Sequence, residues 1–499
     1  MFDGRLNSAD LLRWVALPGG PVLGGLVYLL LHRAGLEHAA CSVGAGAAWM
    51  AVWWMTEAVP LAATSMLPLM LFPALQVTDM RGAAAPYAHP LVALFFGGFV
   101  LGLAVEKWGL HRRLALTTVL TVGTKPSMLI AGFMLATGVL SGFISNTATS
   151  LMMLPIAVSV IGLLEKLGGG QKNFGPALLL AIAYSSSIGG VATITGTQPN
   201  LLTIGFLSDR GIEIGWGSWL PFGLTICAIM MPVTWLVLTR VTLPVNVPSI
   251  PGVKDLLRDE YRGLGRIGRG EWTVIVVFAW VAAGWVMRGP TQDWLTERGL
   301  MTLAGTLRTL GDPGIAMIGA IALFAIPVNA SKRVFAMDWT TASKMPWDVL
   351  LLFGGGLSLA AAMGTSGLDV YIGQQMSGLA GLPAWAIILI VTVSVVMLTE
   401  LTSNTATTAA LVPVLGSAAE GLGLHPVQLM VPAGVVASFA FMLPVATPPN
   451  AIVFSSGRVS IRQMAWSGLL LSLFGAVVIS VVMATVGPRL LGVTLDAGA

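Results

Sequence analysis

The chain has 499 residues, of which 56% are hydrophobic and only 10% are charged, and its mean hydropathy is +0.85. Soluble domains carry about 25% charged residues, and a soluble fold of this size could not cover its surface with less than half that share. The composition therefore indicates an integral membrane protein, and the lack of alternating segments of about ten residues favours helices over a β-barrel. The net charge of +4 is small and spread out, so we interpret it as a topology signal and expect no nucleic-acid partner.

Apolar runs recur along the whole chain, and a bilayer core needs about 20 apolar residues per helix. Two of these stretches, 126–166 and 383–421, are too long for one helix and could each hold two arms. If the four arms cross fully, they raise a count of 11 spans to 15; if each pair forms a re-entrant hairpin, the count stays at 11. The eleven predicted spans are 14–32, 40–55, 59–76, 90–105, 177–206, 217–239, 272–287, 313–330, 347–364, 428–455 and 464–487.

Basic residues indicate the orientation. With the N-terminus inside and both long stretches returning to their starting side, 19 of the 26 Lys and Arg residues lie inside and 7 lie outside. The positive-inside rule therefore predicts a multi-pass protein of the cell's inner (plasma) membrane with a cytoplasmic N-terminus. The rule does not separate re-entrant hairpins from full crossings, because either kind of pair returns to the same side. The seven outer residues are Arg33, Arg81, Arg210, Arg288, Arg298, Arg308 and Arg489.

Two halves of the sequence repeat each other. Residues 145–149 and 403–407 are both Ser-Asn-Thr-Ala-Thr, at an offset of 258. Residues 195–200 match residues 445–450 at an offset of 250. The first half begins its matched helix at the outer side and the second at the inner side, so the halves are inverted. This layout is typical of alternating-access transporters with a site at the membrane midplane.

The two Ser-Asn-Thr triplets each lie near the middle of a long apolar stretch. A polar triplet at that depth marks a bend, and its residues are good N-caps for the arm that follows. A helix N-terminus directed inward offers free N–H groups and a partial positive charge to an anion. Broken backbone at bilayer depth is tolerated only inside protein or beside a cavity, so we favour a binding site over helix packing alone.

The same segments offer oxygen ligands for a cation. Ser141 and Thr399 each lie four residues before a triplet, on the same helix face. Gly196 and Ala446 lie at breaks that contain proline, where unwound backbone exposes carbonyl groups. Hydroxyl, amide and carbonyl oxygens without a carboxylate suit Na⁺ better than Mg²⁺ or Ca²⁺. Nothing in this set titrates near neutral pH, which disfavours proton coupling.

Together, the triplets and the stretches 189–200 and 443–451 resemble the divalent anion/sodium symporter family, over residues 40–487. The resemblance implies an all-α polytopic fold of about 11 transmembrane helices with two opposed re-entrant hairpins in an inverted repeat. It implies a homodimer that moves a transport domain against a scaffold as an elevator. It also implies sodium-coupled symport of a C4 dicarboxylate such as succinate, malate or fumarate, with Na⁺ as the coupling ion. Dicarboxylate exchange, or sulfate or citrate transport, is the alternative within the family.

The sequence predicts a domain division, in which the polar, Gly/Pro-punctuated stretch 241–271 links the two halves, and the resemblance implies which parts are scaffold. Hairpins are expected at 126–166 and 383–421, and broken helices at 177–206 and 428–455. The expected parts are N-terminal scaffold helices (1–88), the first inverted repeat (89–240), a cytoplasmic linker (241–271), further scaffold helices (272–345) and the second inverted repeat (346–487).

The site residues that the resemblance implies fall into three sets. One sodium site comprises Ser141, Ser145, Asn146 and Gly196. The other comprises Thr399, Ser403, Asn404 and Ala446. Gln198 departs from the repeat, because the second half has proline there. The implied substrate contacts are Asn146, Thr147, Thr197, Pro199, Asn404, Thr405, Thr447 and Pro448.

Other classes of function fit less well. The sequence lacks H-E-x-x-H and G-x-S-x-G, and no span holds a pair of catalytic carboxylates, so an intramembrane enzyme is disfavoured. A channel filter usually repeats around a pore axis, which an inverted pair does not provide. Glu57, Glu106 and Glu400 lie near predicted helix ends or bends, where structural pairing is at least as good an explanation as function.

Overall fold

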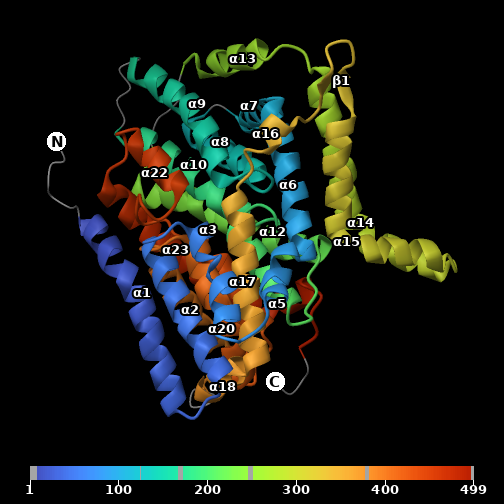
Figure 1. Cartoon of the computed structure of the whole chain (residues 1–499). Helices are drawn as coiled ribbons and strands as arrows, with labels where there is room; N and C mark the ends of the chain where they lie inside the picture. Colours follow the sequence, from blue (N-terminus) through green and yellow to red (C-terminus); the bar gives the residue numbers. More distant parts are fainter. Residues whose placement is uncertain (1–7, 124, 167–171, 246–250, 377–380, 496–499) are drawn as a thin grey trace, which may run out of the picture.

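The computed structural model describes residues 8–123, 125–166, 172–245, 251–376 and 381–495; Arg5, which the topology count places inside, lies outside these ranges. The protein is almost entirely helical (Figure 1). In the described residues, eight helices are long and apolar enough to cross a membrane. The prediction of an all-α polytopic membrane protein is confirmed.

The N-terminal part corrects one predicted span. A single helix over 59–76 is wrong, because two short helices share this stretch. The chain makes a turn at residues 65–66, and Pro68 in the first turn of the second helix has no N–H to bond back to Thr64. The elements here are α1 (Ser8–Arg33), α2 (His38–Thr56), α3 (Leu61–Thr64), α4 (Leu67–Ala74), α5 (Met80–Ala84) and the 3-10 helix η1 (Ala85–Ala88).

The first half of the repeat contains a helical hairpin and an interrupted helix, as expected. The hairpin turns at residues 142–145, and the interruption covers residues 191–197. Its elements are α6 (Pro90–Lys107), α7 (Leu110–Val122), α8 (Pro126–Ser141), α9 (Asn146–Lys166), α10 (Phe174–Gly190), α11 (Gln198–Ser208), α12 (Trp216–Leu236) and the π-helix η2 (Val237–Thr242).

The second half has the same order of elements. Its hairpin turns at residues 400–403, and its interruption covers residues 437–447. In Figure 1, α9 lies toward the end of the molecule that carries α13, whereas α20 and α18 lie toward the opposite end. The elements are α17 (Trp347–Ser366), α18 (Leu368–Met376), α19 (Ala384–Thr399), α20 (Asn404–Gly421), α21 (Val427–Val436), α22 (Pro448–Ser455), α23 (Ile461–Thr485) and α24 (Gly487–Leu490).

The segment between the halves is more ordered than the sequence indicates. The linker contains the amphipathic helix α13 (Val253–Gly263), and the following helix, α14 (Arg269–Glu297), extends beyond its predicted span. The range of α15 (Met301–Ala325) is interrupted by the non-helical Gly311 (φ 58°, ψ −171°), so its second part begins where the span 313–330 was predicted to begin. The predicted span 313–330 is wrong at its end. Its chain leaves the helix after Ala325 and forms the hairpin of β1 (Pro327–Asn329) and β2 (Val334–Phe335), before the short α16 (Trp339–Ala342).

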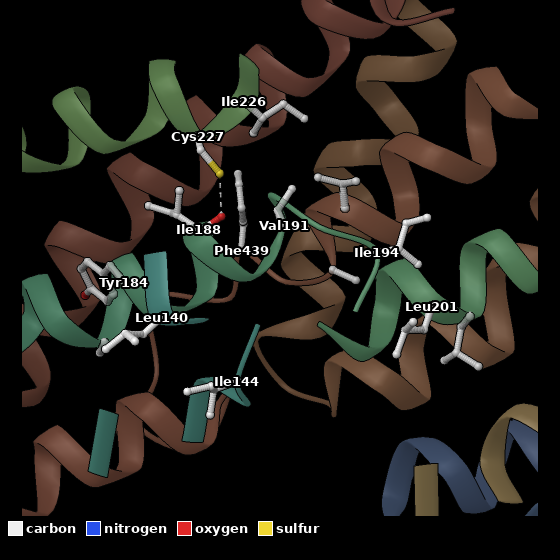
Figure 2. Packing of buried hydrophobic residues seen from close by; sticks show 14 of the residues in the cluster. Leu140, Ile144, Tyr184, Ile188, Val191, Ile194, Leu201, Ile226, Cys227 and Phe439 are labelled. Atoms are coloured by element: carbon white, nitrogen blue, oxygen red, sulfur yellow. Dashed lines mark hydrogen bonds between the residues drawn. The ribbon is translucent and has the colours of Figure 1, made fainter. Parts of the chain in front are cut away.

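The interrupted helices form the centre of the molecule. Every residue of α10 and of α21 is buried. Figure 2 shows this packing around the end of α10, where the Cys227 Sγ of α12 donates to Ile188 O at 3.1 Å. A helix that is apolar on all sides belongs in a core. The backbone breaks therefore lie inside protein or, as at the exposed Val445, beside a cavity, which is the condition for non-helical backbone at membrane depth.

Candidate functional site

Two asparagines hold the interrupted helices open in the same way. Asn200 Nδ2 donates to Val191 O at 3.3 Å and to Thr193 O at 2.8 Å. Asn450 Nδ2, 250 positions later, donates to Ala440 O at 3.1 Å and to Leu443 O at 3.0 Å. Both side chains are completely buried. Each amide thus bonds to backbone carbonyls of the interruption itself and holds that segment in its non-helical course.

The first hairpin turn and the first break surround one amide with oxygens. A terminal atom of the Asn146 amide lies 2.6 Å from Ser141 Oγ, 3.2 Å from Ser186 O and 3.3 Å from Gly196 O. With nitrogen in this place, the amide donates to these oxygens. With Oδ1 in this place, four oxygens converge and only the Ser141 hydroxyl brings a proton. The second arrangement is the neutral oxygen cluster that a small hard cation prefers.

Glycines make room for this cluster. A Cβ at Gly190 would lie 2.8 Å from Asn146 Oδ1 and 3.1 Å from Gly196 O. A Cβ at Gly196 would lie 3.0 Å from Gly142 O and would also press on Gly190 O. Backbone carbonyls can therefore approach the amide only because these positions lack side chains.

The second half repeats the arrangement with a threonine. Thr399 Oγ1 lies 2.8 Å from Asn404 Oδ1 and 3.0 Å from Ala437 O. This hydroxyl has one proton for two acceptors, so hydroxyl, amide and carbonyl oxygens again gather at one point. Ala446, the counterpart of Gly196, is 6% exposed and lines the adjoining cavity.

A cavity of about 990 Å³ lies between the two clusters. The first residues of α9, α11, α20 and α22, which are Asn146, Gln198, Asn404 and Pro448, all line it. Each of these helix starts directs the positive end of a helix dipole at the cavity. The starts of α9 and α20 have no proline in their first turn, whereas α22 begins with two prolines, which have no N–H groups. Four such ends around one space favour an anion. Arg13, Glu57, Glu106 and Lys344 also line the cavity.

All eight predicted substrate residues line this cavity, but their side chains have different surroundings. Thr147 is exposed to the cavity, and its hydroxyl has no hydrogen bond to any described residue. Thr405 is only 6% exposed and donates to Gln198 Oε1 at 2.6 Å. Thr197 Oγ1 lies 3.2 Å from Ser438 Oγ, and Thr447 Oγ1 accepts from Asn450 N at 3.3 Å.

The triplet serines stand apart from the oxygen clusters. Ser145 Oγ accepts from Ala148 N at 3.2 Å, as an N-cap of α9, and is exposed to the cavity. Ser403 occupies the N-cap position of α20 without a side-chain cap bond. The only structural support for their predicted role as cation ligands is therefore that they line the cavity. Ser141 and Thr399, in contrast, contact the oxygen clusters directly.

Several groups at the site were not predicted from the sequence. The carbonyls of Ser186 and Ala437 join the oxygen clusters. Asn200 and Asn450 belong to the repeated motif, and their recurrence at a fixed offset is a signal that could have identified them. The carbonyl ligands left no such signal, because any residue type supplies a carbonyl.

Glu400 braces the second break. Its carboxylate accepts from Phe441 N at 2.8 Å, from Met442 N at 3.0 Å and from Leu443 N at 3.2 Å. Ser472 Oγ donates to it at 3.1 Å. The residue is 3% exposed. A nest of donors of this kind satisfies a buried carboxylate without a basic partner.

A helical membrane protein whose two inverted halves meet at a cavity beside their broken helices has the layout of a secondary transporter. The sequence matches the family described as the sodium:sulfate symporter transmembrane region over residues 14–493. The chain belongs to this family, which confirms the resemblance noted in the sequence. The protein is accordingly a transporter and not an enzyme.

Curated relatives cover nearly the whole chain. The sodium-dependent dicarboxylate transporter SdcS of Staphylococcus saprophyticus is 38% identical over 487 residues, which is 96% of this chain and 92% of the relative. SdcS of Staphylococcus aureus is 37% identical over 485 residues, with the same coverage.

Solved structures support the fold. The YdaH transporter of Alcanivorax borkumensis, described as having an unusual topology, aligns with a TM-score of 0.58 at 17% identity, covering 90% of this chain and 98% of that one. Neisseria gonorrhoeae MtrF aligns with a TM-score of 0.54 at 13% identity, covering 83% and 84%.

Proposed function

We propose that this protein is a sodium-coupled symporter that imports C4 dicarboxylates such as succinate, malate and fumarate. The single observation that supports this most is the convergence of four helix N-termini on one cavity between two matched oxygen clusters. The names of the two SdcS relatives support the same substrate class and sodium dependence.

The anion is bound without basic side chains in the motifs. A dicarboxylate carries two charges, and helix N-termini at both ends of the cavity can each take one carboxylate. The amides of Asn146 and Asn404 and the free hydroxyl of Thr147 supply side-chain contacts. Bound cations beside the same two asparagines add the remaining positive charge.

The cations are sodium. Ser141, Asn146, Gly196 and the Ser186 carbonyl form the first site, and Thr399, Asn404, Ala446 and the Ala437 carbonyl form the second. Ser145 and Ser403 line the cavity at the hairpin turns and complete the proposed ligand sets. All these oxygens are neutral, which suits a monovalent hard cation better than a divalent one. Each asparagine serves both a cation and the substrate, and this sharing couples the two.

Transport is of the elevator type in a homodimer. The hairpins α8–α9 and α19–α20 are re-entrant from opposite sides, and with the broken helices they form the transport domain. Residues 1–88 and 272–345 belong to the scaffold, and 241–271 is the cytoplasmic linker. The protein lies in the plasma membrane with its N-terminus in the cytoplasm. The distribution of basic residues supports this orientation.

Uptake into proteoliposomes tests this proposal. We expect an inward sodium gradient to drive accumulation of radiolabelled succinate, and a matched potassium gradient to drive none. Uptake that needs internal dicarboxylate but no sodium gradient would instead identify an exchanger. Sodium-driven uptake of sulfate or citrate but not succinate would overturn the substrate assignment and keep the coupling.

A further inference from the structure

Gln198 joins the two halves of the binding cavity. It is the first residue of α11 in the first repeat, and its Oε1 accepts from Thr405 Oγ1 of the second repeat at 2.6 Å. Thr405 is buried, whereas Gln198 is partly exposed to the cavity. The bond holds the glutamine amide at the cavity wall with Oε1 toward Thr405.

This bond removes a hydroxyl donor from the cavity. A hydroxyl has one proton, and Thr405 gives it to Gln198. Thr405 then has only lone pairs left, which repel a carboxylate. The glutamine amide compensates, because its Nε2 has two N–H groups and bonds to no described residue.

The equivalent pair of positions in the other half of the repeat has no such hydrogen bond between its side chains. Thr147 corresponds to Thr405, and Pro448 corresponds to Gln198. Proline offers neither a side-chain acceptor nor an N–H group, so Thr147 keeps its proton free for a ligand. The two ends of the cavity thus present different donors: a threonine hydroxyl at one end and a glutamine amide at the other.

We propose that Gln198, rather than Thr405, donates to the substrate carboxylate at the second triplet, and that it selects a carboxylate over a carboxamide at this end. This inference rests on the proposed dicarboxylate transport. A carboxylate only accepts hydrogen bonds, so it pairs with the amide N–H groups. A carboxamide would direct N–H groups of its own toward Gln198 Nε2 in one of its two orientations, and it carries no charge for the helix N-termini.

The test compares the transport of succinate with that of its monoamide, succinamate, in variants of the protein. Uptake is driven by an inward sodium gradient at a pH where succinate is the dianion. Gln198→Glu keeps an acceptor for Thr405 but replaces the donor by a negative charge. We expect its kcat/KM for succinate to fall by roughly 10- to 100-fold, the loss of one charge-assisted hydrogen bond or more. The ratio of succinamate to succinate transport should rise, because a carboxamide can donate to the introduced carboxylate.

Two further variants separate contact from positioning. Gln198→Met has a side chain of similar length that neither donates a hydrogen bond nor replaces the amide acceptor. It should raise KM for succinate at least tenfold without increasing succinamate transport. Thr405→Val should raise KM less than Gln198→Met does. Gln463→Glu, a capping residue on α23 away from the cavity, controls for the added charge and should leave the succinamate ratio unchanged.

The outcomes are distinct. If Gln198→Glu transports succinate like the wild type, Gln198 only positions Thr405 and the inference is wrong. An unchanged succinamate ratio in a variant that retains sodium-induced thermal stabilisation would also contradict it. If the wild type itself shows no sodium-driven succinate uptake, the proposed function fails and the substrate role of Gln198 fails with it.

Discussion

Arg210 and Glu420 join the two repeats at one end of the molecule, with 3.0 Å between Nη1 and Oε1. Arg210 follows α11 of the first repeat, and Glu420 lies near the end of α20 in the second. At the other end, Arg458 follows α22 and pairs with Glu165 near the end of α9. Each interrupted helix is thus attached to the base of the opposite hairpin, which ties both repeats into one unit.

The Arg210 contact should matter for stability more than an exposed ion pair usually does. Arg210 also donates to Pro413 O at 3.2 Å and to Ser417 Oγ at 3.0 Å. Arg210→Ala should therefore lower the melting temperature of the purified protein more than Glu420→Ala, which leaves these two bonds intact. If the two variants lowered the melting temperature equally, the ion pair, and not the bonds of Arg210 to Pro413 and Ser417, would account for the stabilisation.

The asparagines of the triplets should link substrate and sodium affinity. Asn146→Ala or Asn404→Ala removes charge-assisted hydrogen bonds worth roughly 1.5–3 kcal/mol and one cation ligand. We expect KM for succinate and the half-saturating sodium concentration to rise together in transport assays. A variant with normal sodium dependence would remove its asparagine from the proposed cation site.

Glycine at position 190 should be required for the first cation site. Gly190→Ala would place a methyl group 2.8 Å from Asn146 Oδ1, so the amide must move away from the oxygen cluster. Sodium affinity should fall without any change of charge. Gly162→Ala is the matched control, because a Cβ there meets no atom within 4 Å and alanine favours the helix.

Glu400 should act through the second cation site rather than as a proton carrier. In the wild type, backbone N–H groups of the second break donate to the Glu400 carboxylate. Glu400→Gln replaces one acceptor oxygen with an NH₂ group, which cannot accept from these N–H groups. Thr399 is its neighbour in sequence, so the half-saturating sodium concentration should rise. Measured at fixed succinate dianion, wild-type uptake should show no response to an imposed proton gradient. Proton-driven uptake that disappears in Glu400→Gln would assign the carboxylate to proton transport.

Cysteine labelling tests the inverted topology. Single cysteines at Lys125 and Lys166 flank the first hairpin and should react with a membrane-impermeant reagent only from the cytoplasm. Cysteines at Gly381 and Gly423 flank the second hairpin and should react only from outside. Cytoplasmic labelling of the second pair would contradict the opposed hairpins.

The sequence predicts the central elements well because their signals are local and repeated. The hairpin turns lie at the matched triplets, and each helix break ends at a matched proline motif, where the next helix begins with proline in its first turn. The span over 59–76 failed for a related reason. Its hydropathy suggested one helix, whereas the chain turns at residues 65–66 and starts a new helix with Pro68 in its first turn.

Contacts between the repeats could not be predicted. The Thr405–Gln198 bond joins residues 207 positions apart, and it depends on how the two halves pack. The bounds of α14 and α15 also depend on packing. Arg288, expected in an outer loop, instead lies on α14 and pairs with the buried Asp312 of α15 at 2.6 Å. Hydropathy alone would end the first helix before Arg288 and start the second helix after Asp312.

The most direct test of the account is the sodium dependence of succinate uptake in proteoliposomes at constant dianion concentration. In the proposed mechanism, each of two matched cation sites shares an asparagine with the substrate. Uptake should therefore depend sigmoidally on sodium concentration, with a Hill coefficient above one. Uptake should cease when sodium is replaced by potassium. Succinate uptake that continues unchanged without sodium would contradict the central claim that the paired oxygen clusters bind the coupling ions.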